Sequence, residues 1–191
     1  HNRDILNPCD DSVMLVAQEK EFMLRRGRGF APSNIELNLN KNILALGANQ
    51  KSSIAIGFDS NVIISPYIGD LNSIKSIELF KNSIEKFKSI YNFKPEVIVC
   101  DRHPNYESTK FAKSQDIELI QVQHHYAHTL SVMAEHNLNE RVLAIIWDGS
   151  GLGDDGNLWG GEFFIADLNG YERVLHFDYL KLLGGEKAIK E

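Results

Sequence analysis

The chain has 191 residues, with 20 Lys and Arg against 26 Asp and Glu, so its formal net charge at neutral pH is −6. Hydrophobic residues make up 43% and charged residues 24%, which is typical of a globular protein and argues against general disorder. The acidic balance argues against a nucleic acid partner, and no apolar run reaches the roughly 18 residues that a membrane-spanning helix needs. Two cysteines without a Cys-x-x-Cys pair indicate neither a disulfide scaffold nor a zinc finger, so we expect a cytoplasmic protein.

The first 32 residues differ in pattern from the rest. Two short apolar runs, Ser12–Val16 and Phe22–Leu24, flank a charged turn and predict a β-hairpin. Residues 33–42 are rich in Asn and lack periodicity. We interpret residues 1–32 as the end of a preceding domain and residues 33–42 as a linker.

From Ile43 onward the pattern becomes regular. Apolar residues recur at three- and four-residue spacing over residues 74–90, which predicts an amphipathic helix. Strands are expected at Ile43–Leu46, Ser53–Phe58, Val62–Pro66, Glu96–Cys100 and Glu118–Val122, and further helices at Tyr106–Lys113 and His125–Glu135. After Asn139 the order starts again, with strands at Val142–Trp147, Leu158–Asp167 and Arg173–Phe177 and a Gly/Asp-rich turn at Asp148–Asn157.

This order predicts an α/β protein of the actin-like ATPase (ASKHA) fold. A βββαβαβα unit over residues 43–138 forms one lobe, and residues 139–191 begin a second, truncated copy. In such folds the first hairpin of each copy cradles nucleotide phosphates through backbone N–H groups. The turns Gly47–Ser53 and Asp148–Gly156 are rich in small residues, as this role requires, although the same composition also suits a plain strand connection.

The strongest local signal is a group of histidines in the segment from Gln123 to His128. On a helix, His124 and His128 project from one face, and this spacing suits two imidazole ligands of a divalent metal. His125 is turned by about 100° and need not join them. The alternative is that these histidines only form local hydrogen bonds.

A metal site also needs a carboxylate, and Asp148 is the first candidate. It follows the strand Val142–Trp147, where ligand sites of parallel sheets lie. If that strand neighbours the strand before His124, Asp148 and the histidines meet at one sheet edge. Asp101 and His103 follow another strand and are rival candidates.

The segment Asp148–Gly156 has four glycines and three aspartates in nine residues. It lacks the Glu that closes an EF-hand loop and the Gly-Lys-Ser/Thr of a Walker A loop, so a glycine-lined phosphate turn fits better. Lys187 could face an anionic ligand or be an ordinary solvated lysine. Three arginines, Arg25, Arg26 and Arg28, could clamp an anion, end a strand in solvent or touch RNA weakly.

The order of these motifs resembles the HypF carbamoyltransferases, which mature nickel–iron hydrogenases. The resemblance rests on Asp101–Thr109, Val122–His128, Asp148–Gly156, Trp159–Phe163 and Gly184–Ile189. Residues 1–32 are similar to the C-terminal tail of the YrdC-like domain of that family. Residues 43–138 and 139–191 then correspond to the first lobe and the incomplete second lobe of a TsaD-like transferase domain.

The resemblance implies a two-step reaction. The YrdC-like domain makes carbamoyl adenylate from carbamoyl phosphate and ATP, and the transferase domain passes the carbamoyl group to the C-terminal cysteine of a partner, HypE. HypE later dehydrates it to the thiocyanate that supplies cyanide ligands. Because the family extends well beyond these residues, we expect a fragment that is inactive alone.

The resemblance also implies residue roles. His124, His128 and Asp148 would bind a divalent metal, with iron or zinc favoured by the ligand types and magnesium permitted. The nucleotide pocket would be lined by Gly149, Gly151, Gly160, Gly161, Glu162 and Lys187. Two alternatives stay open: a metal- or nucleotide-binding module without turnover, and a sugar-kinase-type phosphotransferase of the same fold, which the histidine pair disfavours.

Overall fold

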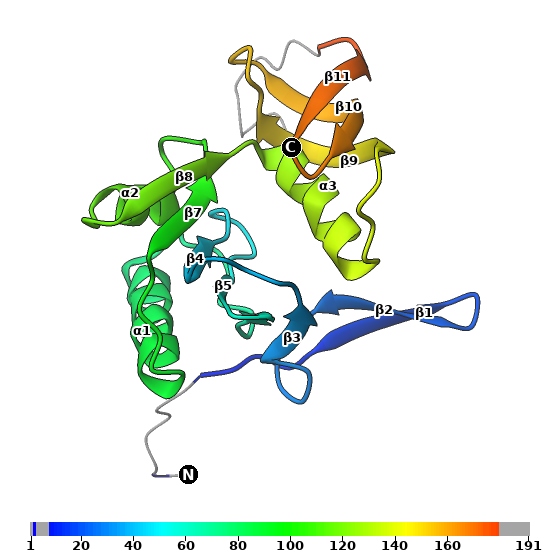
Figure 1. The fold of residues 1–191 in the computed structure, drawn as a ribbon. Coiled ribbons are helices and arrows are strands. Elements are labelled where there is room, and N and C mark those ends of the chain that lie inside the picture. The colour runs from blue at the N-terminus through cyan, green and yellow to red at the C-terminus, as the bar shows by residue number, and fades with distance from the viewer. Residues whose placement is uncertain (1, 3–7, 180–191) are drawn as a thin grey trace. The chain divides into compact units, whose positions relative to one another are not determined.

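The computed structural model describes Asn2 and residues 8–179 (Figure 1). Internal contacts divide the chain into two compact units, His1–Val122 and Gln123–Glu191. The elements are β1 (Val13–Ala17), β2 (Lys20–Arg25), β3 (Ser33–Glu36), β4 (Ile43–Leu46), β5 (Ile54–Phe58), β6 (Asn61–Ile64), α1 (Ile74–Ile90), β7 (Val97–Asp101), α2 (Glu107–Lys113), β8 (Glu118–Val122), α3 (His124–Glu135), β9 (Val142–Leu152), β10 (Leu158–Asp167) and β11 (Gly170–His176). Within the described part of the chain, no helix has both the length and the apolar character needed to cross a membrane.

A six-stranded mixed sheet forms the centre of the first unit, in the order β3-β6-β5-β4-β7-β8. β4, β5 and β6 are an antiparallel meander, whereas β7 and β8 continue parallel to β4. Each parallel strand is reached through a helix, as parallel connections require. Alternate residues of β4 and the apolar stripe of α1 share one core that includes Leu44, Phe80 and Ile84.

Helix α1 occupies the residues that the apolar spacing predicts. It begins at a capping box in which the Ser73 hydroxyl accepts a hydrogen bond from the Ser76 N–H, and the Ser76 hydroxyl accepts one from the Ser73 N–H. Such a box satisfies two backbone N–H groups that the first turn leaves unpaired. Its buried residues are Phe80, Ile84 and Phe87, so one face of the helix covers the sheet.

Strand β3 lies inside the segment that we interpreted as a linker. Ser33–Glu36 pairs antiparallel with β6 and extends the sheet by one strand. Its four residues include Asn34 and Glu36, which have low strand propensity. The strand forms because the backbone of β6 is free to pair on that side of the sheet. A local sequence pattern contains no information about this pairing partner.

The hairpin predicted near the start of the chain is present as β1 and β2. Gln18 and Glu19 both adopt positive φ angles, 51° and 62°, which suits the tight turn of a two-residue hairpin. The paired side chains Leu15 and Phe22 remain about half exposed.

The second unit is a three-stranded antiparallel sheet, β11-β10-β9, with α3 packed on β9 and β10. Ile146, Phe164 and Ala166 form its core, against which Tyr126 of α3 packs. On β9 the alternate side chains Leu143, Ile145 and Trp147 point to the opposite face from Ile146 and are exposed. The sheet therefore has one covered and one open apolar face.

The prediction that Asp148 begins a turn is wrong. β9 continues to Leu152, because Gly151 and Leu152 pair with Trp159 and Leu158 of β10, and the turn is confined to the residues between the two strands. A shift in register between Trp159 and Gly161 accommodates the longer pairing. Glycine-rich strands resemble turns in composition, so the pattern alone misplaced the boundary.

Candidate metal centre

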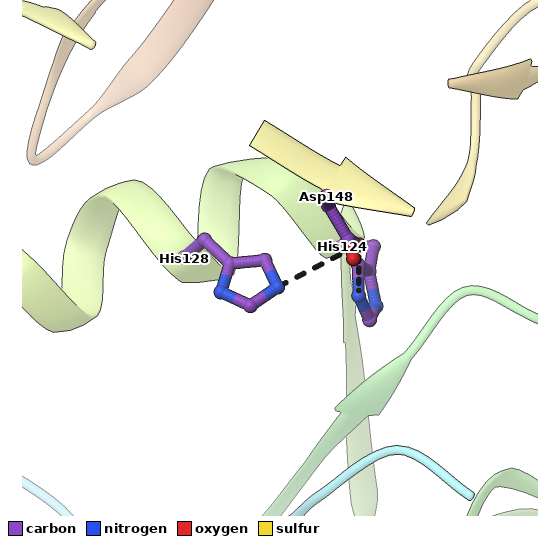
Figure 2. Close-up of side chains that lie close together, drawn as sticks. All are labelled: His124, His128 and Asp148. Atoms are coloured by element: carbon purple, nitrogen blue, oxygen red, sulfur yellow. Dashed lines mark ion pairs between the residues drawn. The ribbon is translucent and has the colours of Figure 1, made fainter. Parts of the chain in front are cut away.

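The site is built from the first turns of α3 and the middle of β9. α3 begins at His124, because the Gln123 side chain caps the helix by accepting a hydrogen bond from the Tyr126 N–H at 2.8 Å. His128 therefore lies about one turn after His124. Asp148 shares the β9 face of Ile146, which belongs to the core beneath α3. The helix and the strand thus direct two imidazoles and a carboxylate toward one another (Figure 2).

The three residues predicted as metal ligands lie together. His124 Nε2 is 3.0 Å and His128 Nε2 is 3.8 Å from Asp148 Oδ2. One potential ligand atom from each residue lies within 4.8 Å of the other two, and in residues 8–179 no other group of three His, Cys, Asp or Glu residues meets this criterion. The His124 side chain is 17% exposed and that of His128 is 54% exposed, so solvent reaches the cluster from the His128 side.

Asp148 is held in its charged form. The neighbouring rings of His124 and His128 keep the pKa of the Asp148 carboxyl well below its ordinary range, although burial acts in the opposite direction. Its other oxygen, Oδ1, accepts a hydrogen bond from the Gly149 N–H at 2.7 Å. An ionised carboxylate beside two imidazoles is a donor set that divalent transition metals accept.

The route by which Asp148 reaches the histidines differs from the predicted one. β8, the strand before His124, belongs to the six-stranded sheet, whereas β9 belongs to the three-stranded sheet, so the two strands are not neighbours. The residues meet because α3 covers one face of β9. Helix-on-sheet packing, rather than a shared strand edge, forms the site.

The rival candidates Asp101 and His103 lie in the first unit. Asp101 ends β7, and its Oδ1 accepts a hydrogen bond from the His103 N–H at 2.7 Å. The His103 ring stacks on Tyr106 with 4.1 Å between ring centroids. Neither residue belongs to the cluster of His124, His128 and Asp148.

His125 also lies near this carboxylate, although it is not a member of the ligand cluster. Its side chain is fully buried, and its Nε2 lies 3.7 Å from Asp148 Oδ2. The angular step along the helix predicts the direction of the Cβ atom, but the ring swings back toward β9. Burial lowers the pKa of His125 to about 4, so the ring is neutral at pH 7. The sequence analysis also missed Gln123, whose side chain lies 3.3 Å from the His125 ring.

The glycines predicted to line a nucleotide pocket have different surroundings. A Cβ atom at Gly149 would meet nothing within 4 Å, so this position is open. A Cβ at Gly151 would lie 2.5 Å from His125 Cε1 and 3.0 Å from His124 Cδ2. Glycine at position 151 therefore allows β9 to approach the two rings.

Three further residues predicted to bind nucleotide, Gly160, Gly161 and Glu162, lie on β10. A Cβ at Gly160 would lie 2.9 Å from the Asp148 carbonyl oxygen, and one at Gly161 would lie 2.4 Å from Phe177 Cδ2. Glu162 is buried and forms a 2.5 Å ion pair with Arg173. Lys187 lies outside the described residues. The nucleotide role of the whole set stays a prediction.

A cavity of about 420 Å³ adjoins the cluster. His128 and Asp148 form part of its wall, and most of the rest is apolar, including Val132, Met133 and Ile146. The size falls within the usual range of small-molecule sites. Sequence patterns did not indicate the cavity, because its wall combines residues of α3 and β9 that serve as ordinary packing positions.

Two family models match the chain. Residues 38–135 match the HypF Kae1-like domain, and residues 144–191 match the second subdomain of the carbamoyltransferase Kae1-like domain. Over 193 aligned residues the chain is 42% identical to the carbamoyltransferase HypF of Synechocystis, covering 100% of this chain and 25% of that protein. It is 37% identical to the probable carbamoyltransferase HypF of Methanocaldococcus jannaschii, covering 100% of this chain and 26% of that one.

Solved structures agree with the family models. The crystal structure of full-length HypF in its phosphate- and nucleotide-bound form matches with a TM-score of 0.94 and 44% identity, over 98% of this chain and 25% of that one. The crystal structure of T. kodakarensis HypF matches with a TM-score of 0.87 and 41% identity, over 96% of this chain and 25% of that one. The chain belongs to the HypF carbamoyltransferase family, and it spans about a quarter of the length of the curated relatives it matches.

Proposed function

We propose that this chain contributes to a carbamoyltransferase that passes the carbamoyl group of carbamoyl adenylate to the C-terminal cysteine of HypE. The adenylate comes from carbamoyl phosphate and ATP at a YrdC-like domain, of which residues 1–32 are the C-terminal tail. The product supplies the cyanide ligands of nickel–iron hydrogenases in the cytoplasm. Membership of the HypF family supports this function.

One observation carries the proposal: the clustering of His124, His128 and Asp148, with ligand atoms within 4.8 Å of one another. Two imidazole nitrogens and an ionised carboxylate fit a divalent ion such as iron or zinc. When bound, such an ion supplies positive charge that stabilises the negative charge developing on oxygen during acyl transfer. The three side chains would hold it between a helix and a strand, which are rigid supports.

The transfer itself is a substitution at the carbamoyl carbon. The cysteine thiolate of HypE forms a C–S bond to that carbon, the C–O bond to the adenylate phosphate breaks, and AMP leaves with the electron pair. The buried part of the cavity wall, including Met133 and Ile146, would shield one side of the activated carbonyl from water. His128 and Asp148 line this cavity, so the substrate carbonyl would lie next to the metal site.

The order of the elements supports the actin-like ATPase fold. A meander of β4, β5 and β6 is followed by α1, β7, α2, β8 and α3, and the strands β9, β10 and β11 begin a similar sequence. On this assignment the turns that end β4 and β9 approach nucleotide phosphates. Gly149 lies within β9 rather than in its terminal turn, but a Cβ atom there would meet nothing within 4 Å, so this strand position leaves room for a ligand.

Metal analysis tests the site. We expect near-stoichiometric iron or zinc in the dialysed chain and its loss in the variant with both His124→Ala and His128→Ala. His136→Ala is the matched control, because His136 is an exposed histidine that follows the same helix. Unchanged metal content in the double variant would contradict the assignment.

The transfer reaction is tested in the full-length protein that contains this sequence. With carbamoyl phosphate, ATP and HypE, mass spectrometry should detect a carbamoyl group on the HypE C-terminal cysteine. The double variant should lose this modification, while pyrophosphate release in the first step continues. Loss of both steps together would indicate a folding defect and would be checked by thermal unfolding.

A further inference from the structure

His125 has no role in the proposed ligand set, yet it is buried beside it. We propose that His125 is a positioning residue: it carries its ring proton on Nε2 and directs that N–H at Asp148 Oδ2, which holds the carboxylate toward the metal. The proposal rests on the proposed metal site and adds the group that orients one of its ligands.

Two backbone groups fix the orientation of the Gln123 amide. Its Oε1 accepts a hydrogen bond from the Tyr126 N–H at 2.8 Å, and its Nε2 donates one to the Leu152 carbonyl oxygen at 3.2 Å. A backbone N–H can only donate and a carbonyl can only accept. The oxygen and nitrogen ends of the side chain are therefore assigned without ambiguity.

This amide sets the tautomer of His125. Gln123 Nε2 lies 3.3 Å from His125 Nδ1, and an amide NH₂ group donates only. Nδ1 must then accept, so it carries no proton, and a neutral imidazole has its single proton on Nε2. Because the lone pair of Nδ1 is engaged by Gln123 and Nε2 is protonated, His125 has no nitrogen left to bind a metal.

The proton on Nε2 faces the carboxylate. His125 Nε2 is buried and has no hydrogen-bond partner among the described residues, and Asp148 Oδ2 is 3.7 Å away. A buried N–H without a partner is unfavourable, and a small approach of the two groups would relieve this. If His124 and His128 each gave a ring nitrogen to a metal, His125 would be the remaining ring that offers Asp148 a neutral donor.

Packing keeps the ring in this orientation. The Trp159 ring lies on one side, with 6.0 Å between ring centroids. Gly151 lies close enough that a Cβ there would be 2.5 Å from His125 Cε1. Ligating carboxylates generally depend on such hydrogen-bonding neighbours, and removing one typically weakens metal binding on the order of 10–100-fold.

Nitrogen-15 NMR of the histidine rings in the metal-free chain tests the tautomer directly. Long-range proton–nitrogen correlations should show a protonated Nε2 and an unprotonated Nδ1 for His125, assigned by the signals that disappear in His125→Gln. A proton on Nδ1, or a doubly protonated ring at neutral pH, would overturn the proposal. This readout needs no metal, so its outcome is independent of whether the proposed metal site is correct.

A matched pair of variants tests the positioning role. The amide of His125→Gln reaches the place of Nε2 and can donate to Asp148, whereas the shorter amide of His125→Asn reaches only the place of Nδ1. We expect zinc affinity, measured by competition with a chromophoric chelator, to fall on the order of 10–100-fold in His125→Asn and to be largely retained in His125→Gln.

Two outcomes would overturn the positioning role. One is unchanged zinc affinity in His125→Asn. The other is equal loss in both variants together with an equal fall in melting temperature, since that would indicate packing alone. A wild-type chain that binds no zinc contradicts the proposed metal site instead, and the tautomer measurement still decides the direction of the His125 proton.

Discussion

At the scale of single residues, His124 and His125 are neighbours in the chain with opposite environments. The His124 side chain is 17% exposed, and its Nε2 lies 3.0 Å from Asp148 Oδ2. The His125 side chain is fully buried where α3 packs on β9. Enclosure removes the solvation that a charged ring needs, so it keeps His125 neutral. The same residue type thus serves as a candidate ligand in one position and as a fixed donor in the next.

The lowered pKa of His125 predicts a dependence of stability on pH. In the unfolded chain the ring takes a proton near pH 6.5, but in the folded chain burial and the nearby His124 and His128 delay protonation to about pH 4, although Asp148 and Glu162 favour it. The unfolded state binds more protons in this window, so the free energy of unfolding should fall as pH falls from 6.5 toward 4. The contribution is at most about 1.4 kcal/mol per pH unit.

Urea unfolding of the metal-free chain at several pH values measures this dependence. The His125→Gln variant is the control, because it lacks the titrating ring. The difference between the two proteins should shrink or reverse as the pH is lowered. Parallel curves for the two proteins would show that His125 titrates alike in the folded and unfolded chain.

Gly151 and Gly149 form a second matched comparison. In Gly151→Ala the new methyl group collides with the rings of His125 and His124, so we expect a loss of about 1–3 kcal/mol in unfolding free energy and weaker metal binding. In Gly149→Ala the methyl group enters open space, and the change should stay within about 0.5 kcal/mol. Chemical unfolding and zinc titration of both variants measure these effects, and equal behaviour would contradict the packing role of Gly151.

At the scale of helices and strands, the sequence pattern predicted those elements that form from the apolar spacing of their own residues. α1 follows from its apolar spacing, and β4 from a short apolar run that ends at a glycine. β3 and the second half of β9 were not predicted, because pairing with β6 and β10 decides them and their Asn and Gly residues favour turns. Pairing partners are a property of the folded chain that no short window contains.

The candidate site divides in the same way. The spacing of His124 and His128 and the position of Asp148 after an apolar strand were readable from the sequence. The packing of α3 on β9, which brings them together, was not. The burial of His125 beside Asp148 and the contact that Gln123 makes with it were not predicted, because both depend on one buried hydrogen bond between the two side chains.

The ion pair between β10 and β11 gives a prediction at this scale. Glu162 is 2% exposed, and its carboxylate is bound by Arg173 at 2.5 Å and by the N–H groups of Gly160 and Gly161. Arg173→Met should cost about 3 kcal/mol or more, because it leaves a buried charge without its partner. Adding Glu162→Gln should restore part of that loss, and a double-mutant cycle by chemical unfolding measures it. Strictly additive losses would show that the pair is not coupled.

At the scale of the whole molecule, the uncovered face of the three-stranded sheet carries several exposed apolar side chains. On the open face of the three-stranded sheet, Leu143 is 60%, Ile145 52% and Trp147 69% exposed. Trp147 also stacks on Phe177, with 5.2 Å between ring centroids, so the aromatic part of this face is continuous. Apolar surfaces of this kind bind hydrophobic dyes.

Replacing Leu143 and Ile145 with Thr should therefore lower the fluorescence of bound anilinonaphthalene sulfonate. The free energy of unfolding should change by less than about 1 kcal/mol, because both side chains are already exposed and Thr is accepted in strands. Leu168→Thr is the control, since Leu168 is 54% exposed but lies in the turn between β10 and β11. An equal fall in fluorescence in the control would show that the dye does not select this face.

The Gln123 cap ties the first turn of α3, which carries His124, to strand β9. The first turn of a helix ordinarily frays, opening and closing on a sub-microsecond scale, and His124 is the first residue of α3. Gln123 binds the Tyr126 N–H with one end of its amide and the Leu152 carbonyl of β9 with the other. The helix start and the strand are thereby tied together, so the turn that carries His124 opens only when its attachment to β9 is also released.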